Sequence, residues 1–184
     1  ADAVEAIKKV ALGRRQRPLV LISDRGRGKS AALGIAAGQL MATQPQHITL
    51  IGPNRRSIAP VLNQARHVLR QHGVDGADGP LEPLGFRFMV PAELADELPQ
   101  SHLVLVDEAA TIPVPTLVRL LMKCPRIVFS TTVQGYEGTG RGFAIRFRGE
   151  LEARRPAWRE VRLEEPIRWA PHDPVEAFIS RALV

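Results

Sequence analysis

Residues 19–30, with the sequence LVLISDRGRGKS, decide the fold of this chain. The apolar run 19–23 has the length of a short buried strand, and the loop that follows it contains Gly26 and Gly28. Glycines allow successive backbone N–H groups to turn inward on an anion, while the start of the next helix directs its positive end at that anion. The pattern therefore predicts a strand, a phosphate-binding loop and a helix in this order.

The last two residues of the loop, Lys29 and Ser30, have the chemistry that a nucleoside triphosphate requires. We expect the Lys29 ammonium to reach the β and γ phosphates and the Ser30 hydroxyl to bind Mg²⁺. Ser23 stands at the first position of the motif, where glycine is usual, so the strict consensus is not met. The predicted cofactors are ATP or GTP with Mg²⁺. The other residues expected to contact the nucleotide are Asp24, Arg25, Gly26, Arg27, Gly28 and Ala31.

A second apolar run, residues 103–106, ends in Asp107 and Glu108, an acidic pair of the kind that a phosphate-loop enzyme needs. We expect Asp107 to hold Mg²⁺ through water and Glu108 to polarise a water molecule lined up on the γ phosphate. Such a glutamate suits a hydrolase better than a kinase, which has to avoid hydrolysis. The alternative is that the acidic pair merely caps a surface turn after a buried strand.

The composition of the chain indicates one folded unit. Its 184 residues, 45% of them hydrophobic, are enough for a single core and too few for two comfortable domains, so residues 1–184 are expected to form one domain. Apolar runs that alternate with helical patterns predict parallel strands joined by crossover helices. The fold class is therefore α/β, a parallel sheet flanked by helices, with the ligand at the carboxyl ends of the strands. The expected strands are 19–23, 48–52, 86–90, 103–107 and 127–132.

Charge and cysteine content narrow the class of protein further. The 25 Lys and Arg residues exceed the 19 Asp and Glu residues, and the net charge of +6 makes a polyanionic partner plausible without requiring one. The single cysteine, Cys124, excludes a disulfide framework within the chain, and the five histidines lack metal-ligand spacing. No stretch has the roughly 18 apolar residues of a membrane span, so we expect a cytoplasmic protein without a membrane partner.

A helix is predicted over residues 55–71, because apolar residues recur along one arc of it. Arg66 and Arg70 line the margin of this arc, where a solvated face is the simpler interpretation. Asn54 and Arg55 differ, because they follow an apolar strand and stand at the expected start of the helix. Backbone N–H groups and an arginine at such a point can hold a nucleic-acid phosphate, so both residues are candidate RNA contacts.

The segment STTVQGYEGTGRG, residues 130–142, follows another apolar strand and combines hydroxyls, an amide, glycines, an aromatic ring and an arginine. We expect residues 130–132 to relay a hydrogen-bond change between the γ phosphate and a neighbouring surface, and Gln134 to sense the phosphate or orient water. Arg141 can meet transition-state charge or an RNA phosphate. Tyr136 is a candidate for stacking on a base, although simple packing is the more frequent role of a lone loop tyrosine.

Three of these motifs together resemble the helicase-like module of the bacterial tRNA(Met) cytidine acetyltransferase family. They are DRGRGKSAALG at 24–34, VDEAATIPVP at 106–115 and TTVQGYEGTGRGF at 131–143, of which the last is the most specific. The resemblance runs from Leu19 to the PIRWA segment at 166–170 and so covers most of the chain. It implies a RecA-like fold of the P-loop NTPase class.

The resemblance also implies an activity and partners. The family forms N4-acetylcytidine at the wobble position of elongator methionine tRNA, with acetyl-CoA in an acetyltransferase domain and ATP or GTP hydrolysis in the helicase-like module. Nothing in this chain resembles an acetyl-CoA-binding pattern, so we expect acetyl-CoA, the acetyltransferase domain and the tRNA-binding domain in other parts of a parent protein. The motifs of the family match Lys29 and Ser30 as phosphate loop, Asp107 and Glu108 as acidic motif, and Arg141 as the arginine of the glycine-rich motif.

Three other interpretations stay open. A stand-alone nucleic-acid motor of the RecD type shares the phosphate loop, the acidic motif and the loop after the second strand. A small-molecule P-loop kinase is disfavoured by Glu108, and the sequence reveals no separate acceptor pocket. A non-hydrolysing scaffold that assembles the acetyltransferase on tRNA would not need Lys29, Asp107 and Glu108 together.

Overall fold

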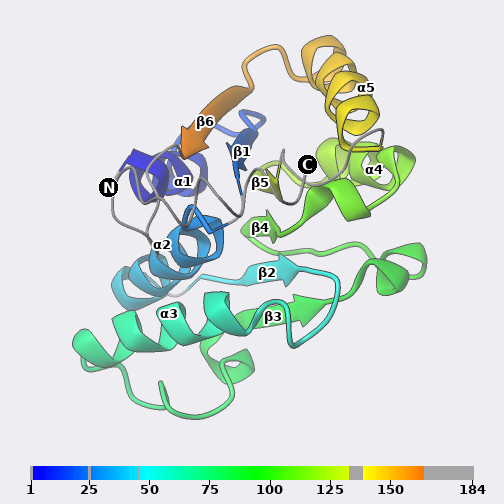
Figure 1. Cartoon of the computed structure of the whole chain (residues 1–184). Coiled ribbons are helices and arrows are strands. Elements are labelled where there is room, and N and C mark those ends of the chain that lie inside the picture. The colour runs from blue at the N-terminus through cyan, green and yellow to red at the C-terminus, as the bar shows by residue number, and fades with distance from the viewer. Residues whose placement is uncertain (1, 25, 45, 133–138, 164–184) are drawn as a thin grey trace, which may run out of the picture.

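The chain folds around a six-stranded parallel sheet, seen in a computed structural model that describes residues 2–24, 26–44, 46–132 and 139–163, with the backbone alone for 139–144. The strand order is β3-β2-β4-β5-β1-β6, and every neighbouring pair is parallel (Figure 1). The parallel α/β sheet predicted from the sequence is therefore confirmed. The strands are β1 Leu19–Ser23, β2 Ile48–Ile51, β3 Phe86–Met89, β4 Leu103–Val106, β5 Ile127–Thr132 and β6 Arg159–Leu163.

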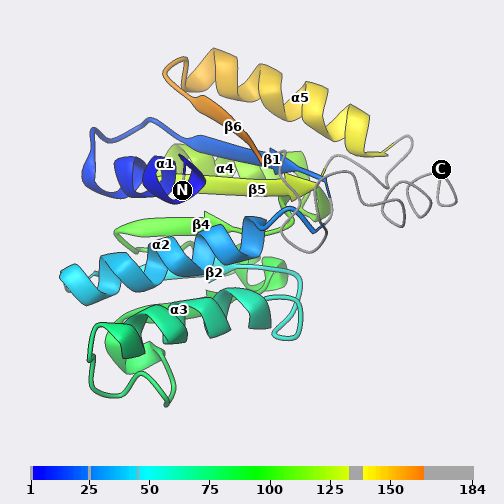
Figure 2. The ribbon, with the colours of Figure 1, turned by 60° about the vertical axis from the view of Figure 1, so that its left-hand side comes forward.

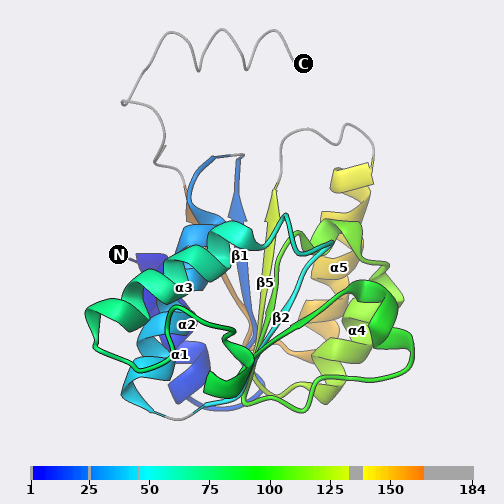
Figure 3. The ribbon, with the colours of Figure 1, turned by 90° about the horizontal axis from the view of Figure 1, so that it is seen from below.

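Two layers of helices cover the sheet within the described residues. Helices α1, α2 and α3 lie on one face, and α4 and α5 lie on the other (Figure 2, Figure 3). One buried apolar cluster fills the space under each layer, because every strand of the sheet interior presents apolar side chains to both faces. None of these helices is both long and apolar enough to span a membrane. The helices are α1 Asp2–Leu12, α2 Lys29–Thr43, α3 Ala59–Gln71, α4 Val114–Lys123 and α5 Thr139–Arg154.

Helices α2 and α3 pack closely because α2 carries glycines where the two helices meet. A Cβ atom at Gly38 would lie 2.8 Å from the carbonyl oxygen of Ala65 and 2.8 Å from the Cβ atom of Val68. A Cβ atom at Gly34 would likewise collide with the backbone of Val61. Larger side chains would push the helices apart. The close contact fixes α2, and with it the end of the phosphate loop, on the sheet.

The five strands expected from the sequence are all present, and none departs from its expected bounds by more than one residue. Strand β6 was not expected. It pairs with β1 at the edge of the sheet, where Val161 and Leu163 pack on the core and the other three residues of the strand are charged. A strand with so few apolar residues has a weak periodic signal, so its position is decided by the neighbouring strand.

Helix α3 begins later than the sequence predicts. Residues 55–58 form turns, and the helix begins at Ala59. The Ser57 backbone N–H donates to Asn54 Oδ1 at 2.9 Å, and Ser57 Oγ donates to the Asn54 carbonyl at 2.8 Å. These bonds close a turn that competes with the helix. Arg55 therefore lies on an exposed turn, and its predicted position at a helix start is wrong.

The strand order places β5 between the strand of the phosphate loop and the strand of the acidic motif. In the register, Ser23 of β1 lies opposite Thr132 of β5, and Val106 of β4 lies opposite Phe129 of β5. Parallel strands end on the same side, so the residues that follow β1, β4 and β5 meet there. We call this side of the sheet the carboxyl edge, and the side where the strands begin the amino edge.

Candidate functional site

The phosphate loop has the backbone geometry that its glycines predict. Gly26 and Gly28 adopt left-handed conformations, with φ of 82° and 85°, which residues with side chains rarely adopt. Helix α2 begins directly after the loop at Lys29, and its N-cap residue, Gly28, has no side chain that could cap the first turn. Backbone N–H groups at an uncapped helix start point at the space in front of the helix, where they can bind an anion.

Lys29 is held by the residue that departs from the consensus. Its side chain is 6% exposed, and Nζ donates to Ser23 Oγ at 3.0 Å. The Ser23 hydroxyl donates its own proton to the Asp24 carbonyl at 2.8 Å, so a lone pair of the hydroxyl faces the ammonium. The serine at the first position of the motif thus supplies a buried cation with a hydrogen-bond acceptor.

The predicted magnesium ligands, Ser30 and Asp107, lie together. Asp107 is 3% exposed, and its Oδ2 lies 3.5 Å from Ser30 Oγ. Ser130 Oγ and the Glu108 backbone N–H each donate to Asp107 Oδ1, both at 3.1 Å. A hydroxyl and a carboxylate oxygen facing each other suit a hard cation such as Mg²⁺, so the residues present fit this ion.

The electrostatics around Asp107 also favour a cation. Burial raises the pKa of its carboxyl above the ordinary value, and the negative charge of Glu108 raises it further. The hydrogen bond from Ser130 lowers the pKa, and Lys29 contributes in the same direction. A positive ion beside the carboxyl would reverse the effect of burial by stabilising the ionised form.

Glu108 sits on a strained turn directly after Asp107. Its backbone is left-handed, with φ 52° and ψ 49°, a conformation that costs a non-glycine residue about 1 kcal/mol or more. Thr111 holds the turn by donating from Oγ1 to the Glu108 carbonyl at 2.7 Å. Thr132 Oγ1 donates to the Glu108 carboxylate, at 3.3 Å to Oε1 and 3.4 Å to Oε2. Both the backbone and the carboxylate of Glu108 are therefore fixed.

Hydroxyl groups on β1 and β5 contact each of the three charged side chains of the site. Ser23 accepts from Lys29, Ser130 donates to Asp107, and Thr132 donates to Glu108. The sequence predicted a relay role for residues 130–132, but it did not identify which hydroxyl serves which charge. Ser23 was recognised only as a departure from the consensus.

The remaining loop residues contribute less to the described geometry. Arg27 Nη2 lies 3.9 Å from Asp24 Oδ2, which ties the two ends of the loop together. Ala31 lies in the first turn of α2, as the predicted role in phosphate binding requires. Arg25 lies outside the described residues.

The candidate RNA contacts Asn54 and Arg55 lie at the carboxyl edge but away from the phosphate loop. They follow β2, which is three strand spacings, or roughly 14 Å, from β1. Arg55 is exposed, lies over the ring of Phe88 at 5.6 Å and lies 4.0 Å from Glu82 Oε1. Both residues stay accessible at the same edge as the nucleotide site, although the Asn54 amide oxygen is already used in its turn.

The structure describes the glycine-rich motif in part. Gln134 and Tyr136 lie outside the described residues. Residue 141 falls in the first turn of α5, whereas the sequence suggested a loop, and the side chain of Arg141 lies outside the described part.

Comparisons with known proteins agree on one family. Residues 20–184 match the family described as RNA cytidine acetyltransferase NAT10/TcmA, helicase domain. The chain is 51% identical over 182 residues to the tRNA(Met) cytidine acetyltransferase TmcA of Nitrosococcus halophilus. This alignment covers 99% of this chain and 24% of that protein. The TmcA proteins of Vibrio cholerae and Haloarcula marismortui are 44% and 40% identical, with 99% and 100% of this chain covered and 26% and 24% of theirs.

The chain thus spans about a quarter of the length of these curated relatives. Among solved structures, the PRRSV helicase aligns with a TM-score of 0.43 and 16% sequence identity, over 86% of this chain and 32% of that chain. A match at this level carries no argument about function.

Proposed function

This chain belongs to the family of RNA cytidine acetyltransferase NAT10/TcmA helicase domains, and we propose that it is a nucleotide-hydrolysing module of such an enzyme. The proposed substrate is ATP or GTP, bound with Mg²⁺ by a single RecA-like domain that comprises residues 1–184. The observation that carries the proposal is the cluster of Lys29, Asp107 and Glu108 at the carboxyl edge, where a hydroxyl group contacts each charge.

In the proposed mechanism the phosphate loop binds the triphosphate. Backbone N–H groups between Gly26 and the first turn of α2 donate to phosphate oxygens, and the Lys29 ammonium neutralises charge on the β and γ phosphates. Ser30 and Asp107 would hold Mg²⁺, which when bound stabilises negative charge that develops on the phosphate oxygens. The contact of Lys29 with Ser23 keeps the ammonium at the loop before the nucleotide arrives.

Glu108 is the proposed general base. It accepts a proton from the attacking water, whose oxygen bonds to the γ phosphorus while the bond to the leaving oxygen of the β phosphate breaks. Thr132 donates to both carboxylate oxygens and so orients the base. Gln134 is proposed to position the water, and Arg141 to stabilise charge in the transition state.

The proposed coupling to RNA uses the same edge of the sheet. Asn54 and Arg55 are proposed to contact a phosphate of tRNA, Tyr136 to stack on a base, and Arg141 to link the RNA to the nucleotide. Residues 130–132 belong to β5 and are followed directly in the chain by the rest of the glycine-rich motif, so a hydrogen-bond change at Thr132 is proposed to pass into that motif.

The biological role proposed for this turnover is remodelling of elongator methionine tRNA, so that its wobble cytidine can be acetylated at N4. The acetyl transfer from acetyl-CoA would take place in another domain of a larger protein, since the relatives are about four times as long as this chain. The tRNA-modifying names of the relatives support this role, and the exposed Arg55 supports a phosphate contact.

Measurement of phosphate release from ATP and GTP, with and without elongator methionine tRNA at low salt, tests the proposal. We expect turnover that tRNA stimulates and that Lys29→Ala abolishes. Stimulation by DNA in preference to tRNA would favour a stand-alone motor, and binding without turnover would favour a non-hydrolysing scaffold. Phosphate transfer to a small acceptor would identify a kinase. Failure to bind either nucleotide would contradict the proposal as a whole.

A further inference from the structure

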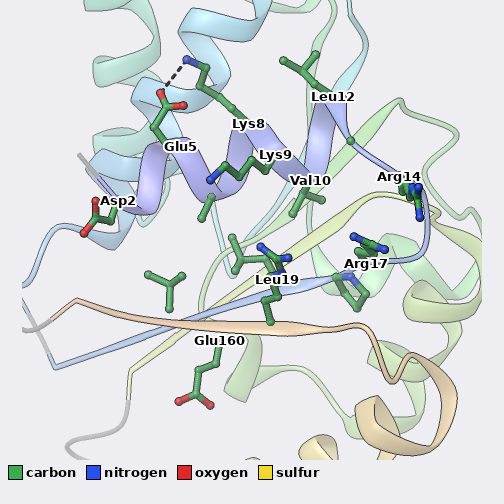
Figure 4. Close-up of a pocket in the computed structure, with 15 residues that line it drawn as sticks. Asp2, Glu5, Lys8, Lys9, Val10, Leu12, Arg14, Arg17, Leu19 and Glu160 are labelled. Atoms are coloured by element: carbon green, nitrogen blue, oxygen red, sulfur yellow. Dashed lines mark hydrogen bonds and ion pairs between the residues drawn. The ribbon is translucent and has the colours of Figure 1, made fainter.

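A groove lies between α1 and the first residues of β1 and β6, away from the nucleotide site. Its volume is about 1060 Å³, and Figure 4 shows the side chains that line it. Leu19 and Arg159, which begin β1 and β6, form part of its floor at the amino edge. The phosphate loop follows the other end of β1, about 16 Å away for a strand of five residues. A ligand in the groove would therefore not compete with a nucleotide.

The groove carries an excess of positive charge that has no carboxylate partner among the described residues. Two of its carboxylates are neutralised on their own elements, since Glu5 binds Lys8 at 2.9 Å and Glu160 binds Arg162 at 2.8 Å. Asp2 is its remaining carboxylate. Four basic side chains of the lining have no carboxylate within ion-pair distance among the described residues: Lys9, Arg14, Arg17 and Arg159.

The charges are separated along the groove. Figure 4 shows Asp2 at the start of α1, Lys9 further along the helix, and Arg14 and Arg17 together beyond its end. Arg15 lies in the same exposed loop. An anion would therefore meet arginines at the amino edge, whereas Asp2, the lining carboxylate with no ion pair among the described residues, lies at the far end of the helix.

The loop that presents these arginines is held in place. Gln16 has a left-handed backbone, with φ 63°, and its N–H donates to the Pro125 carbonyl at 2.7 Å. Arg126 Nη2 donates to the Gly13 carbonyl at 3.1 Å. A non-glycine residue in this conformation costs free energy that surrounding contacts have to repay. The strained and anchored loop keeps its arginines pointing to solvent.

We infer that this groove binds the sugar-phosphate backbone of RNA. Arginine guanidinium groups match phosphate oxygens in a planar and bidentate way, and the unpaired cations of the groove lose no ion pair when they bind. Among the described large apolar residues that are exposed, Leu12 alone belongs to the groove, whereas a protein interface would present an apolar centre. The inference rests on the proposed function for the choice of RNA, and it adds a second contact surface that does not need nucleotide.

Fluorescence anisotropy of labelled elongator methionine tRNA, titrated without nucleotide at several salt concentrations, tests the inference. The double variant Arg14→Ala/Arg17→Ala should bind about tenfold more weakly at low salt. The slope of log affinity against log salt should fall by about two, because two phosphate contacts are lost. Affinity for nucleotide should stay unchanged, which also shows that the variant folds.

Three further variants sharpen the test. Arg14→Lys/Arg17→Lys keeps both charges and should retain most of the affinity. Arg87→Ala removes an exposed arginine that is already paired with Glu97 at 2.8 Å, and should bind RNA like the original chain. Asp2→Asn removes a carboxylate that has no ion-pair partner in the described part of the chain, and it should tighten binding severalfold, a gain that misfolding cannot produce.

Separate results contradict the groove and the proposed function. If the original chain binds tRNA but the double variant has the same affinity and salt slope, the groove is not an RNA site while the nucleotide mechanism stands. If the double variant instead loses contact with another domain of a parent protein and keeps its tRNA affinity, the groove is a protein interface. If the original chain binds no tRNA even at low salt, both the groove and the proposed coupling to RNA are wrong.

Discussion

The two edges of the same sheet handle charge in opposite ways. At the carboxyl edge, Lys29 and Asp107 are almost fully buried, and a hydroxyl group contacts each of them. At the amino edge, Arg14 and Arg17 are exposed and have no ion-pair partner among the described residues. A buried charge needs its partners because desolvation is costly, whereas an exposed charge is screened by water and salt. We therefore expect individual hydrogen bonds to decide function at the carboxyl edge, and the total positive charge to decide binding at the amino edge.

The largest expected effect is that of Lys29→Ala on nucleotide affinity. Lys29 is the buried cation of the phosphate loop, so its loss should reduce triphosphate binding below detection in calorimetry. Lys123→Ala, which removes an exposed lysine at the end of α4, should bind nucleotide normally. Equal affinity in both variants would break the comparison, because the buried charge would then matter no more than an exposed one.

The second effect separates binding from chemistry. Glu108→Gln should keep nucleotide affinity within a few-fold and lower kcat by about 100-fold or more, because an amide cannot accept the proton of the attacking water. Rapid phosphate-release kinetics together with calorimetry measure the two quantities. A matching loss of affinity would assign Glu108 a role in holding the nucleotide instead.

The third effect tests whether the hydroxyl on β5 acts through Glu108. Thr132→Val should lower kcat about tenfold with little change in KM, and Thr132→Ser, which restores the hydroxyl, should recover most of the activity. Thr116→Val, in α4, makes the same change of side chain on another element and serves as the control. An activity loss that serine does not repair would mean that the methyl group packs the site and the hydrogen bond is incidental.

A smaller effect is expected at Arg55, which combines features of both edges. It lies at the carboxyl edge, yet its side chain is 75% exposed. Arg55→Ala should weaken tRNA binding about threefold and reduce the salt slope by about one, the loss of one phosphate contact. Arg70→Ala, which removes an arginine paired with Asp78 at 3.3 Å, is the matched control for anisotropy. An unchanged salt slope would remove Arg55 from the RNA surface.

The smallest effect concerns the loss of folding stability that results from burying the ionised carboxylate of Asp107. Because burial raises the pKa of Asp107 in the folded state, its contribution to stability is fully present below the pKa of the unfolded state and is lost as pH rises through the folded pKa. Without nucleotide or Mg²⁺, Asp107→Asn should therefore raise the melting temperature by a few degrees at pH 7. About 1 kcal/mol corresponds to roughly 2–4 °C in a domain of this size.

The gain should shrink in acid, where the carboxyl of the original chain is also neutral. Melting curves between pH 4 and 7 measure this trend, and Asp78→Asn, an exposed aspartate, should show none. A variant that is less stable at every pH would mean that the hydrogen bonds to Ser130 and Glu108 outweigh the cost of burial.

The sequence by itself determined the local parts of this protein. The alternation of apolar runs predicted β1 to β5 and their parallel sheet, and the order of Gly26, Gly28 and Lys29 predicted a phosphate loop between β1 and α2. In the structure, both glycines of this loop are left-handed. The motifs also identified the family. These features could be predicted because each depends on residues that are neighbours in the chain, whose spacing and backbone freedom leave a local signal.

Only the tertiary structure decided which distant residues meet. It placed β5 between β1 and β4, which brought Ser130 to Asp107 and Thr132 to Glu108. It also placed the charged β6 beside β1 as the outermost strand, where β6 forms part of the basic groove. The sequence also did not predict the left-handed backbone of Gln16 or the hydrogen bond that anchors its loop to Pro125. Strand order and loop anchoring arise from packing between segments far apart in the chain, and the free energy of such contacts has no local pattern that a sequence can display.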